Sequence, residues 1–163
     1  MEFRDKGLEE LALWLPTMWE NYINQRRDAG EDIESLRQEI AELHERLFPN
    51  GKLAADQYVM TIVAGDNEVG TIWLGRPLSG SLDTWFMFGI EIVHHFRGQG
   101  YGRAALETAE GWALDHGGKR LALDVFATNS VARSLYESLG YQIFSTSMFK
   151  DVEARERGQY DNL

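Results

Sequence analysis

The sequence contains no cysteine, and this absence excludes several kinds of chemistry at once. Without a thiol the chain forms no disulfide, has no cysteine nucleophile and cannot ligate zinc through cysteine. It also lacks an apolar run near the roughly 18 residues that a membrane-spanning helix needs. Met1 leads directly into EFRDKGLEE, which has no apolar core like that of a signal peptide. We therefore expect a cytoplasmic protein that does not enter a membrane.

Positive charge is scarce: 16 Lys and Arg residues stand against 26 Asp and Glu, for a net charge of −10. This balance argues against general nucleic-acid binding, which needs a basic face. An acidic surface favours cationic substrates such as amines. The 163 residues suit one domain, with enough core to fold without disulfides or structural metals.

The spacing of apolar residues predicts two helices followed by an α/β layer with a mixed, partly parallel sheet. The first helix is expected over residues 8–22, interrupted by Pro16, and the second over 33–47. The segments that follow have the order β-β-β-α-β-α-β. They are strands at 58–64 and 68–74 joined by a Gly-Asp-Asn hairpin, a strand at 83–93, a helix from the glycine-rich turn to about 115, a strand at 119–126, a helix at 129–140, and a last strand or pair of strands at 141–150. A charged tail occupies 151–163.

Three glycines in five residues, Gly98, Gly100 and Gly102, stand immediately before a helical pattern in RGQGYGRAAL. Glycine allows a tight turn and a close approach to backbone amides. At a helix N-terminus, free N–H groups and the helix dipole attract an anion. Arg97 adds a permanent cation beside them, which suits a pyrophosphate. The turn lacks the Gly-Lys-Ser/Thr of a P-loop.

A second stretch, LALDVFATNSVARSLYESLGYQ, follows the turn and its helix. Together the two resemble the two signatures of the GCN5-related N-acetyltransferase (GNAT) family, in the family's order. The likeness extends from VGTIWL and FGIEIV to MFK, about residues 57–150, and the preceding helices fit the family's amino-terminal pair. It implies one acetyltransferase domain over 1–150, with a helical acceptor-side region at 1–50 and a core at 57–150. It also implies a sheet that splays between its fourth and fifth strands.

The resemblance further implies an N-acetyltransferase that moves an acetyl group from acetyl-CoA to an amine by direct attack. The pantetheine arm would pair with backbone near Ile92 and Val93, and Asn129 would add a hydrogen bond to it. The diphosphate would contact Arg97, Gly98, Gln99, Gly100, Tyr101, Gly102 and Arg103. Tyr136 would be the general acid at the coenzyme sulfur. The alternative function is a non-catalytic acyl-CoA-binding module, which would keep the glycine-rich turn but would need no general acid. A third possible function is nucleotide binding. It is disfavoured, because the glycine-rich turn is not followed by an acidic residue that would bind the ribose.

The general base has two carboxylate candidates, Glu91 and Asp124, each within an otherwise apolar strand pattern. Strand alternation does not decide which of them faces inward, and a water chain or an already neutral amine is the third possibility. No metal is expected, since His94 and His95 lack a carboxylate partner at helical spacing. The acceptor, a small molecule or a peptide amine, is not identified. A homodimer stays possible.

Overall fold

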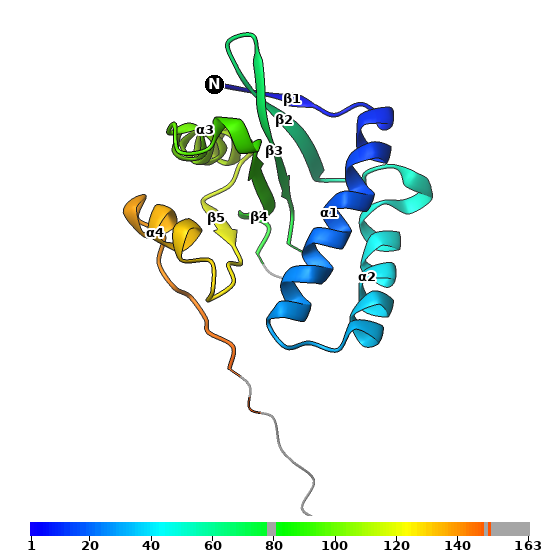
Figure 1. Ribbon diagram of the computed structural model, residues 1–163. Coiled ribbons are helices and arrows are strands. Elements are labelled where there is room, and N and C mark those ends of the chain that lie inside the picture. Colours follow the sequence, from blue (N-terminus) through cyan, green and yellow to red (C-terminus); the bar gives the residue numbers. More distant parts are fainter. Residues whose placement is uncertain (78–80, 149, 151–163) are drawn as a thin grey trace, which may run out of the picture.

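A five-stranded sheet with the order β1-β2-β3-β4-β5 forms the centre of the computed structural model, which describes residues 1–77, 81–148 and 150 (Figure 1). The strands are β1 (Glu2–Asp5), β2 (Gln57–Ala64), β3 (Asn67–Gly75), β4 (Thr84–Ile92) and β5 (Arg120–Leu123). The first four pair antiparallel, and β4 pairs with β5 in parallel. The expected mixed sheet is confirmed.

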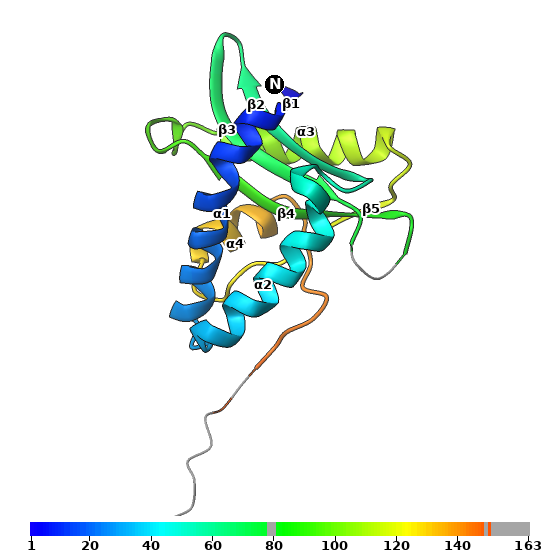
Figure 2. The ribbon, with the colours of Figure 1, turned by 90° about the vertical axis from the view of Figure 1, so that its right-hand side faces the viewer.

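Two pairs of helices cover the two faces of this sheet (Figures 1 and 2). Helices α1 (Leu8–Asp28) and α2 (Ile33–Leu47) lie on one face, followed by the short η1 (Pro49–Gly51). Helices α3 (Tyr101–Asp115) and α4 (Ser130–Ser138) pack on the other, and η2 (His94–Phe96) lies between β4 and α3. The side chains of Leu11, Leu15 and Trp73 fill the core beneath α1, while Leu74, Met87 and Leu106 belong to the core beneath α3.

Local sequence signals place most of these elements correctly. The hairpin between β2 and β3 turns through Gly65 and Asp66, and Ala64 pairs with Asn67. Helix α1 differs from expectation, because it runs through Pro16 without a break. Proline in a helix interior costs about 3 kcal/mol. Here the buried Leu15 just before Pro16 and the partly buried Trp19 after it pack in the same core cluster, so both halves of the helix are held against the sheet.

Strand β1 is absent from the sequence-based expectation. Its four residues, EFRD, show no apolar alternation, so they carry no strand signal of their own. The strand forms because β2 offers an open edge: Glu2 pairs with Val63 and Asp5 with Met60. Arg4 then joins this edge to its surroundings through ion pairs to Glu10 (3.0 Å) and Glu68 (2.7 Å).

The carboxyl-terminal part of the sheet is smaller than the sequence predicts. Strand β5 covers only Arg120–Leu123 of the expected 119–126. The sequence predicts a strand or a pair of strands at 141–150. This prediction is wrong for residues 141–148 and 150, which form no strand in the described part of the chain. Its remaining residue and the predicted tail at 151–163 lie outside the described residues. Strand β5 is therefore the last strand of the described sheet.

Candidate active site

Strand β4 extends beyond the end of its parallel partner β5. Their pairing runs from Thr84 with Arg120 to Met87 with Leu123, after which β4 continues to Ile92. A β-bulge in β4 lies at this point: Leu74 and Trp73, which are neighbours on β3, pair with Met87 and Gly89, so Phe88 is an extra residue between them. Bulges re-aim a strand and often lie beside active sites. The described residues thus contain no strand partner for β4 after Met87 on this side, as the splay expected between the fourth and fifth strands requires.

The glycine-rich turn lies directly beyond this open stretch of β4. Gly98 and Gly100 have φ of 72° and 85°, the left-handed region that favours glycine, and Gly100 is the N-cap of α3. None of the backbone N–H groups of residues 98–103 donates to an acceptor among the described residues. Free amides at a helix N-terminus form an anion site. The turn thus has the geometry that a diphosphate requires.

Side chains brace the turn rather than fill it. The Nε of Arg97 donates to the carbonyl oxygen of Ile92 at 2.7 Å, and its guanidinium lies 3.5 Å from the carboxylate of Glu91. The amide of Gln99 donates to the carbonyl oxygen of His95 at 2.8 Å. Two of the expected coenzyme contacts therefore hold the loop in place: Arg97 ties it to the end of β4, and Gln99 ties it to η2.

The first turn of α3 is held against α4 and η2. Arg103 donates to the hydroxyl of Ser138 in α4 at 2.6 Å. Gly102 is not in the left-handed region, and a Cβ there would lie 3.5 Å from a methyl of Leu135. Tyr101 packs edge-on to Phe96, with ring centroids 5.7 Å apart. These contacts fix where the amides of the turn lie.

The pantetheine arm is expected to pair with the backbone of Ile92 and Val93, but the polar backbone groups of these two residues face opposite sides of the strand. The N–H of Val93 donates to the carbonyl oxygen of Val69 at 2.9 Å and so belongs to the pairing with β3. Because backbone groups alternate sides along a strand, those of Ile92 face the side from which β5 has departed. The Arg97 bond to its carbonyl agrees with this direction.

Helix α4 positions Asn129 and Tyr136. The side-chain oxygen of Asn129 accepts from the N–H of Ala132 at 3.2 Å, so Asn129 is the N-cap of α4. Tyr136 is only 9% exposed and packs into the core beneath α3. Burial raises the pKa of Tyr136, so its phenol keeps its proton at neutral pH. A protonated phenol is the form that a general acid needs.

A second tyrosine, Tyr141, lies beside Tyr136 with ring centroids 5.7 Å apart. Burial raises its pKa as well. Its hydroxyl is the one buried side-chain polar atom that has no hydrogen-bond partner in the described part of the chain. The family resemblance gives a role to Tyr136 and none to Tyr141.

The two carboxylate candidates flank the separation of the strands. Glu91 pairs with Thr71, two residues from Trp73 on β3, so its side chain lies on the face that α1 covers. Its side chain is 58% exposed. Asp124 directly follows β5 and is also exposed. Neither carboxylate is enclosed in the core.

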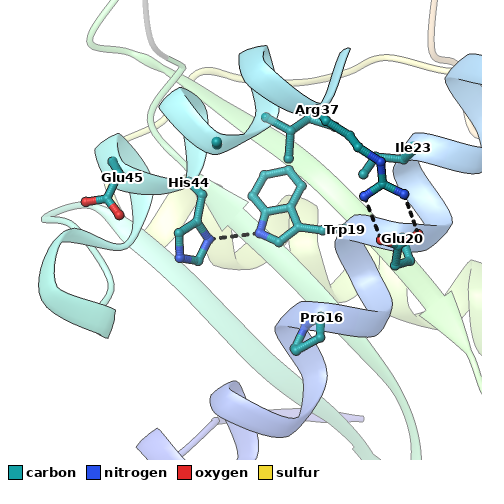
Figure 3. Close-up of a pocket in the computed structure, with 9 residues that line it drawn as sticks. Pro16, Trp19, Glu20, Ile23, Arg37, His44 and Glu45 are labelled. Carbon is teal, nitrogen blue, oxygen red and sulfur yellow. Dashed lines mark hydrogen bonds and ion pairs between the residues drawn. The ribbon is translucent and has the colours of Figure 1, made fainter. Parts of the chain in front are cut away.

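A pocket of about 390 Å³ lies elsewhere, between α1 and α2 (Figure 3). It is lined by Pro16, Trp19, Glu20, Ile23, Arg37, Ile40, Ala41, His44 and Glu45. In it the indole N–H of Trp19 donates to Nδ1 of His44 at 3.0 Å, which leaves the proton of the neutral imidazole on Nε2. None of the site residues expected from the sequence lines this pocket.

The described residues contain no group of three or more histidine, aspartate or glutamate side chains placed to hold a metal ion. Within the same residues, no helix combines the length and apolar character needed to cross a membrane.

The sequence profile of the Acetyltransferase (GNAT) family matches residues 15–141, from within α1 to just beyond α4. The chain belongs to the GNAT acetyltransferase family. It is 32% identical over 151 residues to YdgE of Bacillus subtilis, an uncharacterised N-acetyltransferase, covering 91% of this chain and 96% of that protein. The chain is accordingly an acetyltransferase, and the alternative of a non-catalytic acyl-CoA-binding module finds no support.

Solved structures share this GNAT fold. The crystal structure of YycN from Bacillus subtilis has a TM-score of 0.83 and 24% identity, covering 94% of this chain and 99% of that one. An aminoglycoside N-acetyltransferase solved in complex with CoA has a TM-score of 0.50 and 18% identity, over 74% of this chain and 90% of that one. These likenesses concern the fold.

Proposed function

We propose that this acetyltransferase uses acetyl-CoA and acetylates a primary amine by direct attack on the thioester. The observation that carries the proposal is the juxtaposition of two features: the open stretch of β4 beyond Met87, and the unpaired amides of residues 98–103 at its end. An extended pantetheine can pair along a strand edge, and a diphosphate can bind at a helix N-terminus. The CoA bound by the aminoglycoside N-acetyltransferase of the same fold supports this choice of donor.

The diphosphate would bind the amides of Gly98–Arg103. Arg97 would supply positive charge, and to do so it would exchange its weak contact with Glu91 for a phosphate oxygen. Ile92 would offer its backbone to the pantetheine arm, and Asn129, at the start of α4, would add a side-chain hydrogen bond. Each of these groups lies at the end of an element and not within its core.

In the reaction the amine nitrogen attacks the thioester carbonyl carbon, and the C–S bond breaks. The departing thiolate would take its proton from the phenol of Tyr136, which recovers one from solvent. The acceptor's ammonium must lose one proton before the attack and the new amide nitrogen another after it. Glu91, Asp124 or water would accept these protons. Holding both substrates in line supplies much of the rate enhancement, because it replaces a bimolecular encounter by a positioned one.

The acceptor would approach from the face that α1 covers, where Glu91 and Phe88 lie. Phe88 is partly buried there and stacks on Trp73 with ring centroids 4.7 Å apart. A carboxylate beside aromatic rings favours a protonated amine carried on an apolar body. A cytoplasmic location stays a prediction from the sequence.

A panel of amines tested with acetyl-CoA, with thiol release as the readout, tests this proposal. It should include alkylamines, aromatic amines, aminoglycosides and peptides with free amino groups. Turnover with any amine, confirmed as N-acetyl product by mass spectrometry, supports the proposal. Calorimetry that detects no acetyl-CoA binding would contradict it.

A further inference from the structure

Gly89 leaves an open space on the acceptor side of β4. It pairs with Trp73 and so lies on the sheet face that α1 covers. Gly89 is exposed, and a Cβ at this position would have no atom within 4 Å among the described residues. Its φ lies outside the left-handed region, so the backbone conformation does not require glycine here. Neither conformation nor packing within the described chain therefore explains why this position has no side chain.

The two glycines of β3 differ from Gly89 in this respect. A Cβ at Gly70 would collide with the backbone carbonyl of Glu91, and a Cβ at Gly75 would collide with the side chain of Gln57. Both glycines thus allow a close approach inside the sheet. Gly89 has no such neighbour among the described residues, so the space beside it is available to a ligand.

Phe88 forms an aromatic wall beside this open space. It is the extra residue of the bulge, directly before Gly89, and it stacks on Trp73 with the ring planes 24° apart. Trp73 is itself held in place, since it is buried and its indole N–H donates to Oε1 of the buried Gln57 at 3.0 Å. Phe88 is only partly buried, so part of its ring is open to solvent, and Phe86 lies edge-on to it at 5.0 Å. The aromatic ring of a ligand can stack on such a wall or meet it edge-on.

One carboxylate lies farther along the strand from the open space. Glu91 is two residues beyond Gly89 on the same face, which places it roughly 7 Å away along the strand. It is the only acidic residue of β4, and its side chain is 58% exposed. Its contact with Arg97 would be given up when the diphosphate binds, as proposed above. Strand β4 thus offers a position for one cationic group close to the aromatic wall.

We propose that Phe88 and Gly89 determine which amine is acetylated, and that the acceptor is a primary arylalkylamine. Its aromatic ring would lie against Phe88 in the space beside Gly89, and its single ammonium, on a short alkyl chain, would lie at Glu91. The ammonium becomes an N-acetyl amide, CoA leaves as the free thiol, and one proton passes to solvent. This inference rests on the proposed acetylation of an amine and narrows the class of acceptor. Aminoglycosides, which carry several ammonium groups and no aromatic ring, do not match this face.

Two amines that differ only in the ring test the role of Phe88. The compounds 2-phenylethylamine and 2-cyclohexylethylamine have the same chain and a similar apolar body, but only the first can form aromatic stacking. The wild-type enzyme should have a higher kcat/KM for 2-phenylethylamine, by roughly 2- to 12-fold. Phe88→Leu should remove this preference, whatever it does to the absolute rate. Because the readout is a ratio within one variant, a general loss of stability does not change it.

Gly89→Leu tests the open space itself. The leucine should fill the space and lower kcat/KM for 2-phenylethylamine by roughly tenfold or more, while the Kd of acetyl-CoA in calorimetry stays unchanged. Gly89→Ala should have a smaller effect in the same direction. Gly111→Leu in α3 is the matched control and should keep the wild-type values. Gly111 is also exposed and outside the left-handed region, and a Cβ there would have no atom beyond the helix's own backbone within 4 Å. Circular dichroism checks that each variant is folded.

Equal kcat/KM for the two amines, a preference that survives Phe88→Leu, or an unchanged kcat/KM in Gly89→Leu would each overturn this inference. Weaker acetyl-CoA binding by Gly89→Leu would also overturn it, because the space would then belong to the donor. Turnover of other amines without turnover of 2-phenylethylamine would overturn the acceptor class and leave the proposed function standing. Absence of acetyl-CoA binding to the wild-type enzyme would contradict the proposed function, and this inference with it.

Discussion

The turn at residues 97–103 and the sheet face beneath α1 form the two sides of the proposed site from different kinds of groups. The turn presents backbone amides, made available by Gly98 and Gly100 in left-handed conformation. The face presents side chains, with Phe88 stacked on Trp73 at 4.7 Å and Trp14 edge-on to Trp73 at 6.2 Å. A turn that exposes its backbone amides needs glycines at fixed positions, whereas many combinations of side chains can form an apolar face. The coenzyme side therefore has a sequence motif, and the acceptor side has none.

The largest expected effect tests whether the turn binds an anion through its backbone. Gly100→Glu should abolish detectable acetyl-CoA binding in calorimetry, a loss on the order of 100-fold or more. The reason is strain and charge and not a clash, because φ is 85° and a Cβ at this position would have no atom within 4 Å. Gly117→Glu is the matched control, since Gly117 has a φ of 74° and equally open space at the opposite end of α3. Equal binding by the two variants would contradict the anion site.

The next effect separates chemistry from binding on the α4 side. Tyr136→Phe should lower kcat by roughly 10²–10⁴-fold and leave the Kd for acetyl-CoA unchanged, because a general acid acts in the transition state. Since burial raises the pKa of Tyr136 above its ordinary value of 10.0, the wild-type enzyme should lose no activity through its ionisation below about pH 10.

Tyr141→Phe is the control for this prediction. It removes a buried hydroxyl that has no partner among the described residues, so stability should hold or rise and kcat should stay near wild type. If Tyr136→Phe kept full turnover when chemistry limits the rate, Tyr136 would have a structural role only.

A smaller effect distinguishes the carboxylates on the acceptor side. An alkylammonium with a pKa near 10.4 is only about 0.1% neutral at pH 7.4, so kcat/KM should rise with pH until a base or the amine itself has lost its proton. Glu91→Gln should remove this acidic limb and lower the plateau by about 10²-fold. Asp124→Asn should keep the wild-type profile. The reverse result would assign the base to Asp124, and two unchanged profiles would assign the proton transfer to water or to the free amine.

The smallest expected effect comes from removing a helix cap, and it is measured by comparing the N-caps of α4 and α2. Asn129→Ala should cost about 1 kcal/mol of stability and weaken acetyl-CoA binding. Asp32→Ala removes the equivalent bond to Ser35 at the start of α2 and should destabilise the chain without changing acetyl-CoA affinity. Equal affinities for the two variants would limit Asn129 to capping. Both are measured by thermal unfolding and calorimetry.

The two caps should also differ in their response to pH. Hydrogen bonds from Ser35 lower the pKa of Asp32 below its ordinary 3.8. Its stabilisation is therefore present above that pH and is lost as the pH falls through the lowered value. The contribution of Asn129 has no such dependence, because its side chain does not ionise. Thermal unfolding of each Ala variant beside wild type between pH 2 and 7 measures the difference.

Patterns within one segment predicted much of the fold. The apolar spacing of α2, expected at 33–47, matches Ile33–Leu47, and the Gly-Asp turn between β2 and β3 is where the sequence places it. The failures concern segments whose state depends on a distant partner. The residues of β1 are a strand only because β2 lies beside them, and the expected strand at 141–148 lacks a partner in the described chain.

The sequence by itself determined the glycine-rich turn, the start of α3 and the Asn129 cap of α4. Each is decided within about four residues, by allowed φ values and by a side chain that reaches the next turn of its own helix. Only the tertiary structure decided that the pairing of β4 with β5 stops at Met87, that Glu91 lies on the α1 face, and that the rings of Tyr136 and Tyr141 pack together. These features depend on strand register and packing between segments far apart in the chain, where one residue of slip moves a side chain to the other face.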